Sequence, residues 1–147
     1  MTPQEIRERI LDVVGQNGGH LSSSLGAVEI ALALAETFDP FRDRVVWDVG
    51  HQAYAWKILT EASRGGKSFD TLRKLDGLSP FPNPAESAAD AAVAGHAGVS
   101  ISVAAGLAAA RAARGTDEQV IAVVGDGALG TGQASRRSTT SRRRQGS

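Results

Sequence analysis

The stretch Gln119-Val120-Ile121-Ala122-Val123-Val124, followed at once by Gly125-Asp126-Gly127, decides the fold of this chain. Its β-branched, apolar character is typical of a strand buried in a parallel sheet. Asp126 then lies between two glycines at the strand end. Glycine lets a backbone approach closely, and a carboxylate is a hard oxygen ligand that suits Mg²⁺. The stretch therefore predicts a metal–phosphate site, although Gly-Asp-Gly also occurs in plain turns.

A second short strand is predicted at residues 44–48, closed by Gly50. Helical segments interleave with these two strands, which indicates an α/β domain with a parallel sheet. Helices are expected at residues 3–16, 22–38, 52–60 and 68–75, and an alanine-rich segment at 99–114 suits close packing against a sheet or a helix.

Helix starts are indicated by capping residues. Thr2-Pro3-Gln4-Glu5 has Thr at the cap, Pro at the first position and Glu completing a capping box. Ser22-Ser23-Ser24 offers caps for the second helix, a role that suits these serines better than that of nucleophiles, since no neighbouring base is indicated. Ser68 is expected to cap the helix at 68–75.

Composition and charge bound the function classes. The 147 residues suit one domain, and the absence of cysteine excludes disulfides and thiolate metal sites. No signal peptide and no apolar run long enough to span a membrane is evident, so we expect a cytoplasmic protein without a membrane partner. Residues 1–134 carry a net charge of −5, and residues 135–147 carry +5.

Each of the three histidines directly follows a glycine: His20, His51 and His96. Ligands of open α/β sheets bind beyond the carboxyl ends of the strands, near helix N-termini that attract anions. His51 follows the first strand and Asp126 the second, so we expect them at one site. A single Gly-His pair is more often a capping or surface feature, and the spacing matches no zinc pattern.

Two further features leave alternatives open. The loop at residues 77–87 has prolines at positions 80, 82 and 84, which exclude a helix or a central strand. It is either a mobile lid or a rigid crossing. Trp47 and Trp56 are expected to pack in the core or an interface rather than to contact substrate.

Five motifs in this order resemble the 1-deoxy-D-xylulose-5-phosphate synthase family of transketolase-like thiamine-diphosphate enzymes. The resemblance covers residues 5–134 and only the opening part of the family's longer polypeptide. It implies an incomplete parallel-sheet thiamine-diphosphate-binding domain. The motifs are Gly18-Gly19-His20-Leu21-Ser22-Ser23-Ser24-Leu25-Gly26, Trp47-Asp48-Val49-Gly50-His51-Gln52-Ala53-Tyr54, Gly77-Leu78-Ser79-Pro80-Phe81-Pro82, Gly95-His96-Ala97 and Gly125-Asp126-Gly127.

The resemblance implies condensation of pyruvate with glyceraldehyde 3-phosphate and release of CO₂, in isoprenoid and thiamine biosynthesis, by a homodimer that uses thiamine diphosphate and Mg²⁺. It also implies the site. Asp126 would coordinate Mg²⁺, with Gly127 and Ala128 lining the diphosphate. His20 would lie near the reacting carbon as a proton donor or hydrogen-bond partner, and His51 would be catalytic as well as in contact with the cofactor. The remaining implied cofactor contacts are Gly95, His96 and Ala97.

The chain departs from the family pattern. Trp56 stands where a second histidine is usual, and Pro80 where glycine is common. No asparagine follows Asn83, although the family has one that completes the metal site, and the domain that supplies the activating glutamate is not found. We therefore expect the isolated chain to be inactive.

The arginine- and serine-rich segment 135–147 is expected to be disordered. Ordinary codons for residues 133–141, read one base earlier, can encode a segment that resembles the helix of the family, so we hypothesise a frameshift near Gly132 and premature termination. An acidic body and a tail without aromatic residues argue against nucleic-acid binding. The alternative to an enzyme fragment is a non-catalytic remnant or binding fragment that needs a partner chain.

Overall fold

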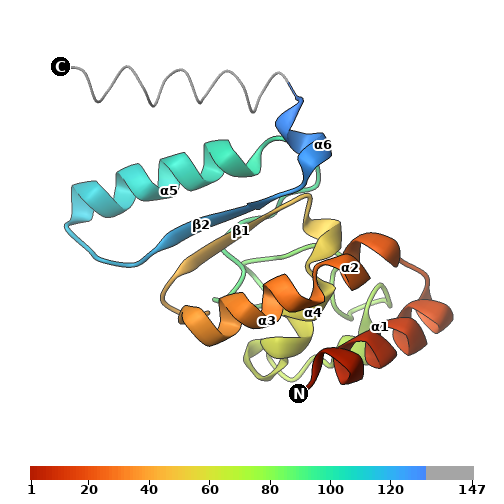
Figure 1. The fold of residues 1–147 in the computed structure, drawn as a ribbon. Coiled ribbons are helices and arrows are strands. Elements are labelled where there is room, and N and C mark those ends of the chain that lie inside the picture. The colour runs from red at the N-terminus through yellow and green to blue at the C-terminus, as the bar shows by residue number, and fades with distance from the viewer. Residues whose placement is uncertain (132–147) are drawn as a thin grey trace.

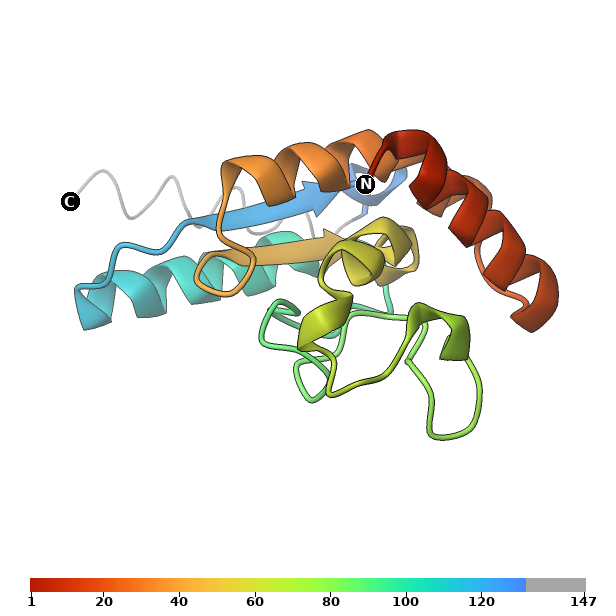
Figure 2. The same ribbon diagram turned by 90° about the horizontal axis from the view of Figure 1, so that it is seen from below.

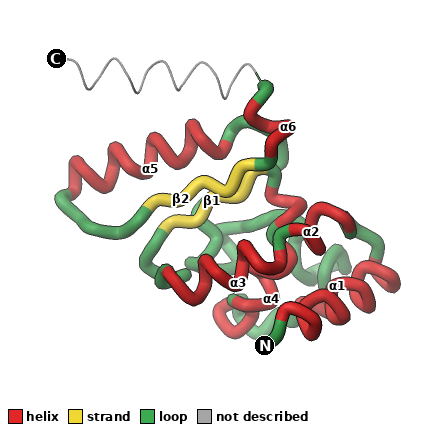
Figure 3. Tube along the Cα trace, viewed as in Figure 1, coloured by secondary structure: helices red, strands yellow, loops and turns green. Residues whose placement is uncertain are grey.

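The computed structural model describes residues 1–131. Within them, helices alternate with two strands, as Figures 1 and 3 show. The expected boundary at residue 134 and the proposed frameshifted tail lie outside the described residues. The elements are α1 (Pro3–Asn17), α2 (Ser22–Gly26), α3 (Val28–Thr37), β1 (Arg44–Asp48), the 3-10 helix η1 (Gly50–Gln52), α4 (Tyr54–Leu59), the 3-10 helices η2 (Glu61–Ser63) and η3 (Phe69–Thr71), α5 (Ser100–Arg114), β2 (Val120–Val124) and α6 (Asp126–Leu129).

The two strands form a parallel pair, with Arg44 opposite Val120 at one end and Asp48 opposite Val124 at the other. Figure 2 shows α3 and α5 on opposite sides of this pair. The prediction of an α/β domain with a parallel sheet is therefore confirmed. Because the strands run in the same direction, both end at one edge, where η1 and α6 begin.

The core lies where α1, α3 and α4 pack together. The capping box predicted at Thr2 and Glu5 is present. Trp47 and Trp56 are almost fully buried, with ring centroids 6.1 Å apart, so their predicted role in core packing is confirmed. The buried residues of α1 are Ile6, Ile10, Val13 and Val14.

The predicted helix at 22–38 is in fact two helices, and its serines do not cap it. The chain leaves helical geometry at Ala27, between α2 and α3. The residue that precedes α2 is Leu21, which makes no side-chain capping hydrogen bond. Ser24 instead donates its hydroxyl to the backbone oxygen of His51 at 2.7 Å. A long-range partner therefore takes the hydroxyl that the local pattern assigned to a cap.

The helix predicted at 68–75 was also wrong. Ser68 accepts a hydrogen bond from the Asp70 N–H, but the helix that it caps is only η3. Leu72 is extended, and Arg73 and Asp76 have positive φ, which stops a helix from continuing. The helix expected at 52–60 is shorter, with η1 and α4 in its place.

None of the helices within residues 1–131 has both the length and the apolar character that crossing a bilayer requires.

Candidate functional site at the carboxyl ends of the strands

The carboxyl ends of β1 and β2 bring two of the predicted motifs to one edge. The Gly125 N–H donates to the backbone oxygen of Asp48 at 3.4 Å. His51 follows Asp48 by three residues, and Asp126 follows Gly125 directly. The expectation that these motifs meet at one edge agrees with this topology.

His20 and His51 lie side by side although 31 positions separate them, with ring centroids 5.0 Å apart. The His20 N–H donates to the hydroxyl of Tyr54, the first residue of α4, at 3.3 Å. Gly19 makes this approach possible: its φ is +147°, and a Cβ there would lie 2.7 Å from the Tyr54 hydroxyl. Steric hindrance by Tyr54 therefore explains why glycine precedes His20.

Burial lowers the pKa of the His51 imidazole below its ordinary value, and the neighbouring His20 lowers it further. Asp48 opposes this shift but does not cancel it. Two imidazoles in contact disfavour a second positive charge, so His51 is predominantly neutral near pH 7. A neutral imidazole can accept as well as donate a hydrogen bond, which suits a group that exchanges protons.

The Gly95-His96-Ala97 segment is tied to the same edge through its backbone. The Gly50 N–H donates to the backbone oxygen of Ala94 at 2.8 Å. On the other side of the segment, the Gly98 N–H donates to both carboxylate oxygens of Asp48, at 3.0 and 2.9 Å. His96 itself is exposed. The segment is thus anchored at both ends, with its histidine at the surface.

Asp48 was not among the predicted site residues, yet it links all these segments. Its carboxylate also accepts from the Ser100 N–H at 3.2 Å and from the Ser100 hydroxyl at 2.6 Å, which fixes the start of α5. Its backbone oxygen accepts from the side-chain amide of Gln52. An acidic residue as the last position of an apolar strand was the available signal.

Asp126 is the exposed first residue of α6, and its carboxylate accepts from the Gly127 N–H at 2.7 Å. Ala128 is buried, whereas Gly127 is exposed and has no described atom within 4 Å of where a Cβ would lie. Among residues 1–131, no three carboxylate or imidazole side chains gather closely enough to hold a metal ion. Asp126 fits a divalent cation as a single hard ligand beside open space, where phosphate oxygens could supply others.

A match to the 1-deoxy-D-xylulose-5-phosphate synthase family covers residues 2–139. The chain belongs to this family. It is 53% identical over 130 residues to 1-deoxy-D-xylulose-5-phosphate synthase of Nitratidesulfovibrio vulgaris, and 54% identical over 132 residues to that of Thermus thermophilus. These matches cover 88% and 89% of the chain but 20% and 21% of the relatives. The chain thus spans about a fifth of the length of the curated relatives that it matches.

Trp56, where we expect a departure from the family pattern, lies in the core and not at the site. Its side chain is fully buried, and its indole N–H donates to the backbone oxygen of Ala89 at 3.1 Å. The tryptophan thereby attaches the segment after the proline loop to α4.

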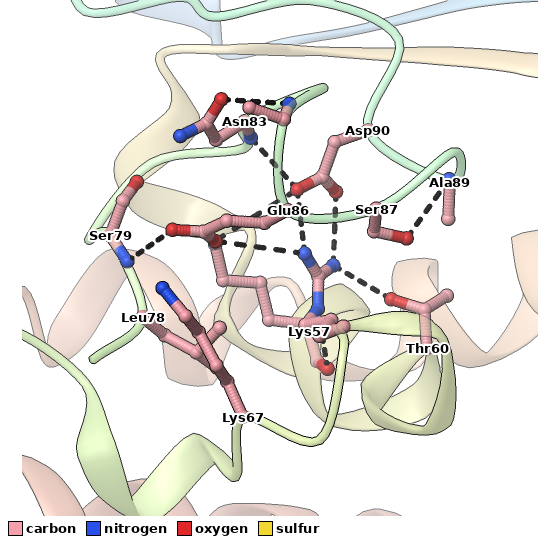
Figure 4. Close-up of polar contacts among 12 residues, drawn as sticks. Lys57, Thr60, Lys67, Leu78, Ser79, Asn83, Glu86, Ser87, Ala89 and Asp90 are labelled. Carbon is pink, nitrogen blue, oxygen red and sulfur yellow. Dashed lines mark hydrogen bonds and ion pairs between the residues drawn. The ribbon is translucent and has the colours of Figure 1, made fainter. Parts of the chain in front are cut away.

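A buried cluster of four charged side chains is the second feature of this family member that sequence reasoning missed. Figure 4 shows Lys57 of α4 close to Glu86, near the end of the proline loop, and to Asp90, which follows the loop. Arg64 completes the cluster and binds Asp90 through two hydrogen bonds, of 2.7 and 3.0 Å. Partners about 30 positions apart in the chain carry no local sequence pattern, so no signal could have paired them.

Proposed function

We propose that this chain forms the first part of the thiamine-diphosphate-binding domain of a 1-deoxy-D-xylulose-5-phosphate synthase. The reaction would condense pyruvate with glyceraldehyde 3-phosphate and release CO₂. One observation carries the proposal: the parallel strands of a member of this family end at an edge that carries His51, the anchored Gly95–Ala97 segment and Asp126. That is where an α/β sheet binds its ligand.

Each site residue has a proposed task. Asp126 would hold Mg²⁺ through a carboxylate oxygen. The diphosphate would occupy the space beside Gly127, next to the buried Ala128. The Gly95–Ala97 backbone and His51 would contact the cofactor. When bound, thiamine diphosphate supplies the carbanion-stabilising chemistry that loss of CO₂ requires.

The paired imidazoles would manage protons at the reacting carbon. A neutral His51 can accept a proton at a ring nitrogen, and His20, 5.0 Å away between ring centroids, is more exposed and can exchange protons with solvent. The His20 backbone N–H donates to the Tyr54 hydroxyl, and this hydrogen bond fixes the backbone from which the imidazole extends.

A chemical-shift footprint tests the proposed site. Thiamine diphosphate with Mg²⁺ is added to the isotope-labelled polypeptide, and the backbone amides are followed by NMR. We expect the amide shifts to centre on residues 95–97 and 126–128 and on His51. Mg²⁺ added without thiamine diphosphate should leave the His51 amide unshifted. Shifts confined to other surfaces, such as α1, would contradict the proposal.

We further propose that the polypeptide of residues 1–147 is inactive by itself. Residues 1–131 offer one exposed carboxylate at the proposed metal position and no cluster of three ligands. Interactions that form only in the transition state contribute most to the rate. A polypeptide without the groups that make them loses turnover even where some affinity for the cofactor survives. Release of CO₂ from pyruvate in the presence of glyceraldehyde 3-phosphate, above a protein-free background, would show this to be wrong.

The sparse metal shell also favours a second candidate, a binding fragment that acts together with another chain. The missing ligands would then come from a partner that carries the remaining family domains. Adding a purified polypeptide with those domains should restore CO₂ release if this candidate is right. Failure to restore it, with both polypeptides folded, would count against it.

A further inference from the structure

The tip of the proline loop touches the segment that carries His51. A Cβ placed on Gly50 would lie 2.5 Å from Pro82 Cδ and 3.2 Å from Phe81 Cδ1, so glycine is needed for this contact. The Phe81 ring also lies near the other histidine, with its centroid 6.4 Å from that of His20. Phe81 therefore stands next to the His20 ring and to Gly50, the residue that precedes His51.

Two carboxylates hold the loop on either side of Phe81. Glu86 accepts a hydrogen bond from the Ser79 N–H at 2.8 Å, and Asp90 accepts one from the Asn83 N–H at 2.8 Å. The bonded residues precede and follow Phe81 by two positions each. Ser79 also donates its hydroxyl to the backbone oxygen of Phe81 at 2.6 Å. The backbone around Phe81 is thus fixed at three points.

Buried cations hold these carboxylates in turn, and Figure 4 shows Lys57 beside Glu86. Lys57 Nζ lies 2.8 Å from Glu86, and Arg64 binds Asp90 with two hydrogen bonds. The side chains of Lys57, Arg64 and Asp90 are 0% exposed, and that of Glu86 is 7% exposed. Opening the loop would separate buried opposite charges, which is strongly unfavourable because each charge left behind has no compensating partner.

We infer that Glu86 and Asp90 are positioning residues that fix Phe81 beside His20 as a permanent wall of the site. Of the two alternatives for the proline loop, a mobile lid and a rigid crossing, the rigid crossing therefore applies. Both cations come from α4 and the turn after it, only six and thirteen positions beyond His51. One buried cluster therefore sets the distance between the wall and the histidines. The wall's relevance to the reaction rests on the proposed function, but its rigidity does not.

NMR of the polypeptide without any cofactor tests the inference, so its failure is separable from failure of the proposed function. In the unsubstituted chain, we expect a nuclear Overhauser contact between the Phe81 and His20 rings. We also expect Ser79 and Asn83 amides to exchange with solvent about 10- to 100-fold more slowly than unbonded loop amides. Phe81→Leu should shift the His20 ring resonances while the indole resonances of the core stay unchanged.

Asp90→Asn is the decisive variant, and Asp12→Asn, at an exposed position of α1, is the matched control. We expect Asp90→Asn to lose the Phe81–His20 contact and to speed Asn83 exchange at least about tenfold, with no such change in the control. A folded Asp90→Asn variant that keeps the contact overturns the inference. If this variant does not fold, exchange in the unsubstituted chain decides: fast exchange at Ser79 and Asn83 overturns the inference, and slow exchange supports it.

Discussion

At the scale of single residues, Asp48 explains why separate motifs form one site. Its carboxylate holds Gly98 and Ser100, and its backbone oxygen accepts from Gln52 and Gly125. It therefore touches the segments that lead to His51, to α5 and to Asp126. A buried carboxylate is stable when backbone N–H groups donate hydrogen bonds to it, because these bonds replace the ones that water would make.

Replacing Asp48 with Asn should lower the free energy of unfolding by about 1–3 kcal/mol, because the NH2 half of the amide faces buried donors and cannot accept hydrogen bonds from them. Ser100→Ala, which removes one hydroxyl donor and leaves the carboxylate its backbone partners, should cost about 0.5–1.5 kcal/mol. Urea unfolding followed by tryptophan fluorescence measures both. A cost below about 1 kcal/mol for Asp48→Asn, or a cost smaller than that of Ser100→Ala, would show that the carboxylate does not have the linking role assigned to it.

The pKa of His51 gives a second prediction at this scale. It should lie below the ordinary value of 6.5, and His20→Asn should raise it, since the positive charge of a protonated His20 is then absent. The lowered pKa means that the folded state favours neutral His51. Its contribution to stability is present above pH 6.5 and is lost as the pH falls through the folded-state pKa.

Titration of the imidazole resonances by NMR measures this shift. His96→Gln is the control, because His96 is not among the groups that shift the pKa of His51. The His51 midpoint should be unaffected in that variant. A midpoint that stays the same after His20→Asn would mean that the two rings do not interact electrostatically.

At the scale of elements, local patterns with neighbouring partners were predicted correctly. Helix α1 has its cap, its first-position proline and its apolar face within one short segment, so the sequence sufficed. Strands β1 and β2 were recognised by their apolar runs, and the parallel sheet followed from the helices between them. Parallel pairing also placed His51 and Asp126 at one edge.

Elements whose hydrogen bonds go to distant partners were not predicted. Ser24 bonds to His51 instead of capping a helix, and the helix expected after Ser68 is replaced by a turn with positive φ at Arg73. The buried cluster around Arg64 and Asp90 could not be predicted from the sequence for the same reason, since its members meet only after folding. In the site itself, the roles of Asp48 and Phe81 depend on such contacts.

Two of the serine or threonine caps that the sequence suggested, Thr2 and Ser22, should differ in a stability measurement. Thr2→Ala removes the hydroxyl that accepts from the Glu5 N–H and should cost about 1 kcal/mol. Ser22→Ala, at the start of α2, should change the free energy of unfolding by less than about 0.5 kcal/mol, since α2 has no side-chain cap. Denaturant midpoints of the two variants compare them, and a larger loss for Ser22→Ala would refute the assignment.

At the scale of the whole molecule, two long-range devices meet at the same edge. Asp48 links the strand ends to the start of α5, and the buried cluster attaches the proline loop to α4. Both devices lie within residues 1–131, so the edge has a defined geometry in this part of the chain. We propose that this edge, in a chain that spans about a fifth of the length of its curated relatives, binds thiamine diphosphate through Mg²⁺.

Calorimetric titration of thiamine diphosphate into the polypeptide, with and without Mg²⁺, tests that claim most directly. We predict weak binding that requires Mg²⁺ and that falls at least about tenfold in Asp126→Asn, because the carboxylate is the proposed metal ligand. Asp12→Asn, far along α1, should bind as the unsubstituted chain does. Binding that is indifferent to Mg²⁺ or to Asp126, or no binding by a folded chain, would contradict the account.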